Sequence, residues 1–236
     1  LIGPVPAKGV QQDGRLKSQN HELSGRAAGF SRFRLFLCGW TMEAFDDKIK
    51  RAVVGIAGLG GLGSNVAVML ARTGIGALII ADFDRVEPSN LNRQHYFVDQ
   101  IGRGKVECTQ ENLGRIAPDV KVEGHAVKLT ADNAPQVFAE ACVVVECFDK
   151  ADQKRMIVET VLNRMPRAAV VAASGLAGYG RSNAVQTRRV SERFVLVGDG
   201  GSGTDSCPVL TAGRVAIAAA HQANAVIELI VDELDI

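Results

Sequence analysis

The clearest indication of the fold lies in GIAGLGGLGSNVAVMLARTGIG, which runs from Gly55 to Gly76. An apolar run at its start, AVVGIA (52–57), is typical of a buried strand, and SNVAVMLARTG (64–74) has the pattern of an apolar-faced helix. Between them the chain has G-x-G-x-x-G spacing, with one further glycine: Gly58, Gly60, Gly61 and Gly63. Glycines at this spacing let the backbone N–H groups of a helix N-terminus approach a phosphate. The stretch therefore predicts a nucleotide-binding turn, but it does not say which nucleotide is bound.

The segments that follow alternate between strand-like and helix-like patterns. Strands are expected at 77–82, 121–129, 142–148 and 168–174, and helices at 105–116, 133–141 and 151–164. This alternation predicts an α/β fold, a Rossmann-like and mostly parallel sheet with helices on both faces. After Ser174, the runs 182–190 and 193–199 predict a short antiparallel extension. A mobile loop (198–206) and a last helix (about 212–232) complete the prediction.

The bulk composition is that of an ordinary globular chain. Hydrophobic residues make up 47% and charged residues 22% of the 236 residues, and the formal net charge is +1. This charge supplies no large basic field, so we expect neither a nucleic-acid partner nor a membrane surface. The most apolar stretch, 215–231, is interrupted by polar residues and does not predict a membrane span. Residues 1–40 lack apolar periodicity and are expected to form a tail or partial arm, ahead of one domain over 41–236, whose first helix is expected at 42–51.

The cysteines do not form a recognisable framework. They number five, and no two of them make a C-x-x-C pair: Cys38, Cys108, Cys142, Cys147 and Cys207. A disulfide framework and a structural zinc site are therefore both unexpected. We expect reduced thiols in a cytoplasmic protein.

A polar excursion after the second strand narrows the choice of nucleotide. Asp82 follows the strand where an acidic side chain can accept hydrogen bonds from ribose hydroxyls, which suits NAD and ATP equally. The next residues, DFDRVEPSNLNRQ, then supply amides and a cation, and IGRGK adds a second cation: Asn90, Arg93, Gln94 and Lys105. A triphosphate carries more negative charge than the pyrophosphate of a dinucleotide, and charge-assisted hydrogen bonds are the strong ones. The cluster therefore favours ATP.

A further carboxylate follows the strand at 142–148. Asp149 is expected at the carboxyl edge of the sheet, where ligands bind in open α/β folds. A carboxylate there can hold Mg²⁺ against phosphates, and Glu146 is close enough in sequence to assist. Taken alone, an acid at the position of Asp149 is more often a helix N-cap, and the two roles are compatible.

Together these motifs resemble the ThiF/MoeB/HesA family, the bacterial relatives of ubiquitin-activating enzymes. The resemblance rests on the glycine loop with SNLNRQ, on GRGKVE and on ECFDKADQK, and it runs from about Arg51 to Val231. AASGLAGYGRSN (172–183) and GRVAIAAAHQAN (213–224) are similar to a short ThiF subgroup.

The resemblance implies ATP-dependent adenylyl transfer with magnesium, in which the C-terminal glycine of a small β-grasp sulfur carrier ending in Gly-Gly is activated. The pathway implied is thiamine thiazole synthesis, and the assembly implied is a homodimer. Matched residue by residue, Asp82 would hold the ribose and Asp149 the magnesium, while Asn90, Arg93, Gln94 and Lys105 would line the phosphates.

Three positions depart from the family pattern or extend it. The two C-x-x-C pairs that bind zinc in many members are missing, which again predicts no zinc. The arginine that reaches a neighbouring subunit's site has only a poor match, Arg34. Cys207, in TDSCPVL, lies where a family cysteine can form a persulfide-linked adduct with the carrier, and Arg214 is expected to lower the pKa of its thiol.

Other functions remain open on the sequence. A dehydratase acting on a modified adenosine of tRNA has similar segments, although the weak net charge disfavours an RNA substrate. An NAD(P)-dependent oxidoreductase would leave the phosphate cluster unexplained. A non-catalytic nucleotide-binding regulator is disfavoured by the presence of Arg93 and Asp149.

Overall fold

The computed structural model describes residues 41–203, 207 and 209–234. The tail predicted for residues 1–40, with Arg34 and Cys38, lies outside the described residues. The boundary between tail and domain therefore stays a prediction.

Strands and helices alternate along the described residues. The strands are β1 (Val53–Ala57), β2 (Ala77–Ala81), β3 (Lys121–His125), β4 (Val143–Glu146), β5 (Ala169–Ala173), β6 (Gln186–Ser191) and β7 (Phe194–Gly198). The helices are α1 (Met42–Arg51), α2 (Gly61–Thr73), α3 (Lys105–Ile116), α4 (Ala134–Val137), α5 (Ala151–Arg164) and α6 (Ala212–Glu228), which runs on into a π-turn, Leu229–Glu233.

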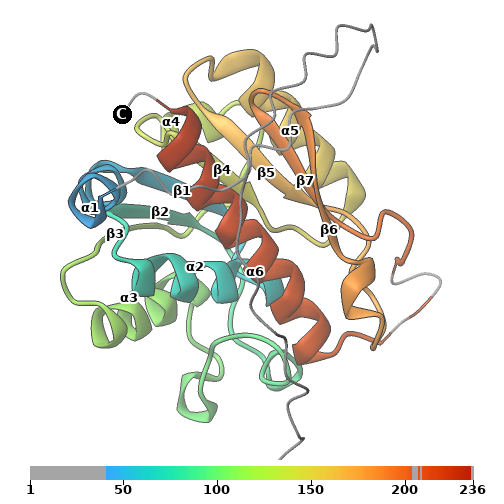
Figure 1. Cartoon of the computed structure of the whole chain (residues 1–236). Helices are drawn as coiled ribbons and strands as arrows, with labels where there is room; N and C mark the ends of the chain where they lie inside the picture. The colour runs from blue at the N-terminus through green and yellow to red at the C-terminus, as the bar shows by residue number, and fades with distance from the viewer. Residues whose placement is uncertain (1–40, 204–206, 208, 235–236) are drawn as a thin grey trace, which may run out of the picture. The chain divides into compact units, whose positions relative to one another are not determined.

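The strands form one seven-stranded sheet in the order β3-β2-β1-β4-β5-β7-β6 (Figure 1). All neighbouring pairs are parallel except β6 and β7, which are antiparallel. The predicted fold class, a mostly parallel Rossmann-like sheet with a short antiparallel extension, is confirmed.

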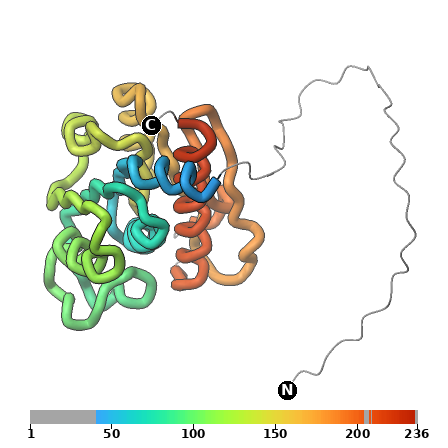
Figure 2. Tube along the Cα trace, turned by 60° about the vertical axis from the view of Figure 1, so that its left-hand side comes forward, coloured from blue at the N-terminus to red at the C-terminus, as the bar shows by residue number. Residues whose placement is uncertain are grey.

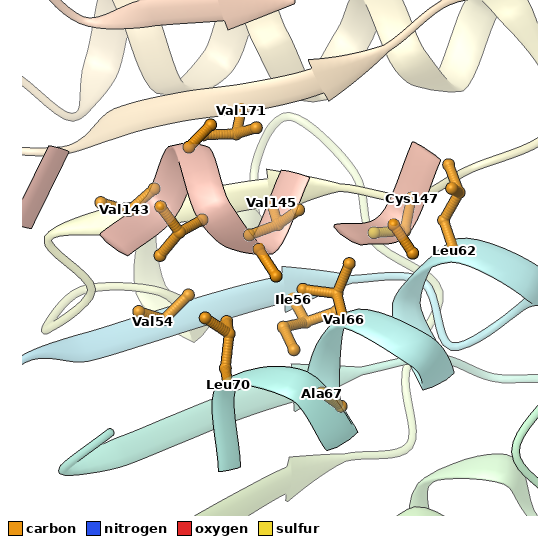
Figure 3. Packing of buried hydrophobic residues seen from close by; sticks show 14 of the residues in the cluster. Val54, Ile56, Leu62, Val66, Ala67, Leu70, Val143, Val145, Cys147 and Val171 are labelled. Carbon is orange, nitrogen blue, oxygen red and sulfur yellow. The ribbon is translucent and has the colours of Figure 1, made fainter. Parts of the chain in front are cut away.

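A separate hydrophobic cluster covers each face of the sheet, because successive side chains of a strand point to opposite sides. Val143 and Val145 of β4 pack with residues of α2 and α6, whereas Val144 packs with residues of α5. Figure 3 shows the first cluster, in which strand valines lie against Val66 and Leu70 of α2. The prediction of helices on both faces is therefore also confirmed.

The last helix is a core helix. By length and composition Ala212–Glu233 could cross a membrane, but 56% of its apolar window is buried inside the protein. Its far end is fastened to α1, where Lys48 Nζ donates to the carbonyls of Val231 and Leu234 at 2.9 and 3.1 Å, and the two segments lie side by side in Figure 2. Core packing accounts for its apolar character.

Several predicted elements are shorter than expected, and two of them are shorter by four residues or more. The third strand ends at His125 rather than 129, because its neighbour β2 ends at Ala81 and Asp82 N–H makes the last bond, to the His125 carbonyl. The helix expected at 133–141 is a single turn, α4, followed by tighter turns that bury Phe138.

The glycine-rich loop predicted to be mobile at 198–206 is organised in its first part. The Asp199 carboxylate accepts hydrogen bonds from the N–H groups of Gly201 and Ser202 at 2.9 and 2.8 Å, and from Ser202 Oγ at 2.7 Å. The expectation that this segment cannot order itself is wrong for 199–202, and residues 204–206 lie outside the described residues.

Candidate nucleotide-binding site

The carboxyl ends of β1, β2 and β4 meet at one edge of the sheet. Ala57, the last residue of β1, is in register with Ala81 of β2 and Glu146 of β4. The strand order changes direction at β1, since the chain goes first to β2 and later returns to β4 on the other side. Ligands of open α/β sheets bind in the crevice at such a switch point. The glycine loop, Asp82 and the loop after β4 all open onto it.

The glycine loop is closed on itself in a way that only glycine permits. Gly58 has a φ of +93°, and a Cβ on Gly63 would lie 1.8 Å from the Gly58 carbonyl oxygen. Gly60 is the N-cap of α2 and contributes no side-chain cap, and Gly61 is the first helical residue. The N–H groups of the first turn of α2 have no intrahelical acceptors and carry the positive end of the helix dipole.

Asp82 stabilises the glycine loop through hydrogen bonds. Its carboxylate accepts hydrogen bonds from the N–H groups of Leu59 at 2.6 Å and Asp84 at 2.7 Å, and the residue is 9% exposed. The sequence predicted a ribose acceptor at this position. The structure adds a role that the motif did not reveal, because the same carboxylate joins the glycine loop to the polar excursion.

The polar excursion is fastened to α2 and the glycine loop by three contacts. Ser64 Oγ accepts from the N–H of His95 at 3.1 Å, Asn65 Nδ2 donates to the Arg93 carbonyl at 3.0 Å, and Tyr96 Oη donates to the Leu59 carbonyl at 2.8 Å. Burial raises the pKa of the Tyr96 phenol, so it stays a donor. None of these anchors was singled out in the sequence, because each acts through a backbone group.

The excursion brings Arg93 and Gln94 to the glycine loop. The Arg93 Cγ and Nε atoms lie 3.6 Å from where a Cβ on Gly61 would be, and its Nη1 donates to the Ser89 carbonyl. Gln94 is 9% exposed, and its Oε1 is a buried oxygen without a partner among the described residues. Such an atom is costly unless a ligand or a water satisfies it. The side chains therefore fit a ligand with both anionic and hydroxyl groups, as ATP has.

The predicted residues Asn90 and Lys105 are already engaged. Asn90 Oδ1 accepts from the Glu87 N–H at 3.1 Å and closes a short turn. Lys105 Nζ donates to Asp84 Oδ2 at 3.0 Å, and its side chain is 7% exposed. Phosphate binding by Lys105 would therefore compete with Asp84. A pocket of about 380 Å³ opens beside Lys105 and Asp82, within the size range of small-ligand sites.

Asp149 and Glu146 differ sharply although only three residues separate them. Asp149 is exposed, and no described residue donates a hydrogen bond to its carboxylate. A free carboxylate beside a phosphate site is the kind of ligand that Mg²⁺ takes, so the position fits the predicted metal. Glu146 is completely buried and pairs with Lys154, so it is not open to a shared metal as the sequence suggested. Burial raises the pKa of the Glu146 carboxyl, against the opposing effect of Lys154.

Among the described residues there is no group of three or more His, Cys, Asp and Glu side chains placed to hold a metal ion. The absence of zinc stays a prediction, because residues 1–40 are not described.

The comparisons with known proteins agree with this fold. A model described as the ThiF family matches residues 35–235. The chain belongs to the ThiF family.

Curated ThiF-family relatives match over part of their length. Ubiquitin-like modifier-activating enzyme 5 of Caenorhabditis elegans is 44% identical over 84 residues, which are 36% of this chain and 20% of that protein. The same enzyme of Aedes aegypti is 34% identical over 131 residues, which are 50% of this chain and 33% of that protein. The matched segments thus span a third of these relatives or less.

Solved structures share the fold. The E. coli tRNA N6-threonylcarbamoyladenosine dehydratase TcdA in complex with ATP has a TM-score of 0.71 at 21% identity, covering 80% of this chain and 89% of that one. E. coli MccB with AMPCPP and MccA has a TM-score of 0.61 at 26% identity, covering 80% of this chain and 58% of that one.

The second loop region of this ThiF-family chain follows β5 and β7. Arg214, in the first turn of α6, donates through Nη2 to Asp199 Oδ2 at 2.6 Å and through Nη1 to the carbonyls of Gly180 and Arg181 at 3.1 and 2.7 Å. The Arg214 guanidinium is therefore committed to Asp199, and the predicted influence of Arg214 on Cys207 stays a prediction. Cys207 is half-buried, and its Sγ lies 3.5 Å from where a Cβ on Gly178 would be.

The predicted residues therefore fall into two groups. The glycine loop, Asp82, Asn90, Arg93, Gln94 and Lys105 are joined by contacts at one edge of the sheet. Asp149 follows the adjoining strand β4 at that edge, whereas Cys207 belongs to the loops that precede α6.

Proposed function

We propose that the protein is an ATP-dependent adenylyltransferase that activates the C-terminal glycine carboxylate of a small β-grasp sulfur carrier protein. One observation carries the proposal. The bare N-terminus of α2, the Arg93 and Gln94 side chains and the exposed Asp149 carboxylate belong to loops that converge on the switch point of the sheet. These groups match the charge pattern of a nucleoside triphosphate with its magnesium.

The reaction that suits this arrangement needs no general base. An oxygen of the carrier's carboxylate attacks the α-phosphorus of ATP, the bond from that phosphorus to the bridging oxygen of the β-phosphate breaks, and pyrophosphate leaves with the electron pair. The nucleophile is already ionised, so the protein must position two anions and offset their charge. The α2 N–H groups and Arg93 would do so directly, and Lys105 would join them by exchanging Asp84 for a phosphate. Magnesium held by Asp149 would supply further positive charge at the phosphates.

The partner is proposed from the family. The relatives named above include an activating enzyme for a ubiquitin-like modifier and MccB, whose structure holds AMPCPP together with MccA. The short-subgroup segments in the sequence favour a sulfur carrier, with thiamine thiazole synthesis as the pathway. We also propose a cytoplasmic homodimer, for which light scattering should give about twice the chain mass.

ATP–pyrophosphate exchange tests the reaction directly. With magnesium, exchange should require a Gly-Gly-ended carrier and should vanish with a carrier that lacks the two glycines. Asp149→Ala should lower exchange by about a hundredfold or more, the scale of one lost electrostatic stabiliser. Asp152→Ala is the matched control, since Asp152 is another exposed acid three residues away, and it should leave the rate unchanged.

Three results would contradict the proposal. Exchange that is undiminished in Asp149→Ala would remove that residue from the chemistry. ATP consumption that depends on tRNA and not on any carrier would favour the dehydratase alternative. Reduction of NAD without a carrier would point to an oxidoreductase.

A further inference from the structure

Glu146 is a fully buried charged side chain at this edge of the sheet, and both of its carboxylate oxygens accept hydrogen bonds. It is the last residue of β4, and its exposed fraction is zero. Its Oε1 accepts from the Phe148 N–H at 2.7 Å and from Lys154 Nζ at 3.0 Å. Its Oε2 accepts from Lys154 Nζ at 3.1 Å and from the Ala173 N–H at 3.3 Å. Both oxygens thus serve one backbone donor and one cation each.

These contacts join three elements around one carboxylate. Phe148 belongs to the loop between β4 and α5, Ala173 ends β5, and Lys154 lies in the first turns of α5. The Glu146 carbonyl also accepts from Gln222 Nε2 of α6 at 2.9 Å, which adds a helix from the other face of the sheet. The geometry of the β4–α5 loop is therefore set from several directions at once.

The loop that Glu146 fixes carries Asp149 and packs on the glycine loop. A Cβ on Gly58 would lie 3.1 Å from Phe148 Cδ1 and 3.2 Å from the Cys147 carbonyl oxygen, so the two loops are already in contact. Asp149 follows Phe148 directly and has no described hydrogen bond of its own. Its placement relative to the glycine loop depends on the residues before it, and the Phe148 N–H is held by Glu146.

We propose that Glu146, held in place by Lys154, is a positioning residue that sets Asp149 against the phosphate-binding loop. Glu146 does not touch the nucleotide or the metal, because its two oxygens are filled and buried. It acts by fixing the loop from which Asp149 reaches magnesium. The inference rests on the proposed function for its metal, but it is tested through nucleotide binding rather than through carrier activation.

Glu146→Gln is the informative change, because it preserves volume and removes one acceptor. An amide has a single acceptor oxygen, and its NH₂ group is a donor. The NH₂ group replaces one carboxylate oxygen, so the backbone N–H of either Phe148 or Ala173 then faces a donor instead of an acceptor. Lys154 loses its charge partner, but its side chain is 24% exposed and water can solvate it.

The experiment measures ATP affinity calorimetrically on the full chain, without carrier, in EDTA and in magnesium. The ratio of the two affinities is the strengthening that magnesium supplies. E146Q should reduce this ratio about tenfold and leave the affinity in EDTA within about twofold. D149N should remove most, but not all, of the strengthening, and the double variant should show the same ratio as D149N alone, because residues that act as one unit are not additive.

Controls separate positioning from a general loss of structure. Glu159→Gln removes the acid of another ion pair on α5, the exposed Arg155–Glu159 pair, and should leave the ratio unchanged. If E146Q fails to unfold cooperatively, a folded Lys154→Met protein decides, since it removes the counter-charge of Glu146 and changes no backbone donor. It should reduce the ratio about threefold, and Lys154→Arg should restore it.

The inference is overturned if folded E146Q keeps the full magnesium strengthening, if its effect adds to that of D149N, or if Lys154→Met has no effect. It is also overturned if magnesium does not strengthen ATP binding to the unmutated protein. Magnesium-dependent ATP binding without any carrier-dependent exchange would instead contradict the proposed carrier reaction and leave this inference standing.

Discussion

The loops after β1, β2 and β4 differ from those after β5 and β7 in what their polar groups contact. In the first region, Asp82 and Glu146 are buried and hold backbone N–H groups, while Asp149 remains exposed and unpartnered among the described residues. In the second region, Asp199 and Arg214 bond to each other and to the neighbouring backbone, although Arg214 Nε is buried without a partner among the described residues. Glu146 holds the backbone before Asp149 and leaves Asp149 open to a ligand, whereas Asp199 and Arg214 use both their charges to hold the fold. The first region is therefore suited to ligand binding. The Asp199–Arg214 pair, which we call the brace, stabilises the loops of the second region.

Breaking the brace should have the largest effect on stability. Asp199→Ala leaves the Arg214 guanidinium, whose side chain is 3% exposed, without its counter-charge. Removing one partner of a buried pair costs about 3–5 kcal/mol in the free energy of unfolding. Urea denaturation should show this loss, whereas Asp149→Ala should change stability by less than about 0.5 kcal/mol. Equal effects of the two changes would erase the distinction between the regions.

Crowding the glycine loop should damage binding more than folding. In Gly63→Ala the new Cβ would meet the Gly58 carbonyl at 1.8 Å, so the loop must open, and ATP affinity should fall about a hundredfold, or about 2.7 kcal/mol. Gly114→Ala is the control, because nothing lies within 4 Å of its added Cβ. This exposed helix position should instead gain about 0.5–1 kcal/mol of stability. Unchanged ATP affinity in Gly63→Ala would show that the tight turn does not serve the nucleotide.

The pH dependence of stability should report the brace as well. Partial burial by itself raises the pKa of Asp199, but hydrogen bonds from Ser202 and Gly201 and the Arg214 charge outweigh it, so the pKa falls from 3.8 to about 2. The lowered pKa contributes stability that is present above pH 4 and is lost as the pH falls from about 4 to 2. After allowance for solvent screening, this is about 1 kcal/mol. The stability difference between Asp199→Asn and the unmutated protein should therefore shrink across that window, and a constant difference would contradict it.

The smallest effect on adenylation is expected at Cys207. Cys207→Ser should keep ATP–pyrophosphate exchange within about twofold, since activation of a carboxylate needs no thiol. Intact-protein mass spectrometry should show that a reductant-sensitive adduct with the carrier, formed in the presence of a sulfur donor, is lost in the same variant. An adduct that persists, or that maps to Cys108, Cys142 or Cys147, would assign that chemistry elsewhere.

The elements predicted most accurately are those whose ends are determined by residues nearby in the sequence. The predicted bounds of α1, α3 and α5 coincide with the observed ones, because each is an amphipathic run that a loop or strand interrupts at both ends. The run expected as a helix at 133–141 has helix-forming residues but forms only α4, since burial of Phe138 tightens the turns that follow. The third strand was overestimated because its length depends on its neighbour β2, which its own residues do not encode.

The candidate site divides in the same way. The glycine loop, Asp82, Arg93, Gln94, Lys105 and Asp149 were visible as candidates because their spacing along the chain carries the signal. The residues that form hydrogen bonds or ion pairs with them could not be predicted from the sequence. Lys105 is held by Asp84, Glu146 by Lys154 and α6, and Arg214 by Asp199, and in each case a residue's neighbours depend on how strands and helices come together.

Local sequence patterns suffice to predict the alternation of strands and helices, the glycine turn and the polar residues around it, because periodicity and glycine spacing act over a few neighbouring residues. Which of those polar residues are exposed depends on how the elements pack. Asp149 and Glu146 are both acids three positions apart, yet one faces solvent and the other lies beneath the sheet edge with every acceptor filled. That difference arises from the packing of β5, α5 and α6 around the end of β4, since burial and hydrogen-bond partners are properties of the assembled fold.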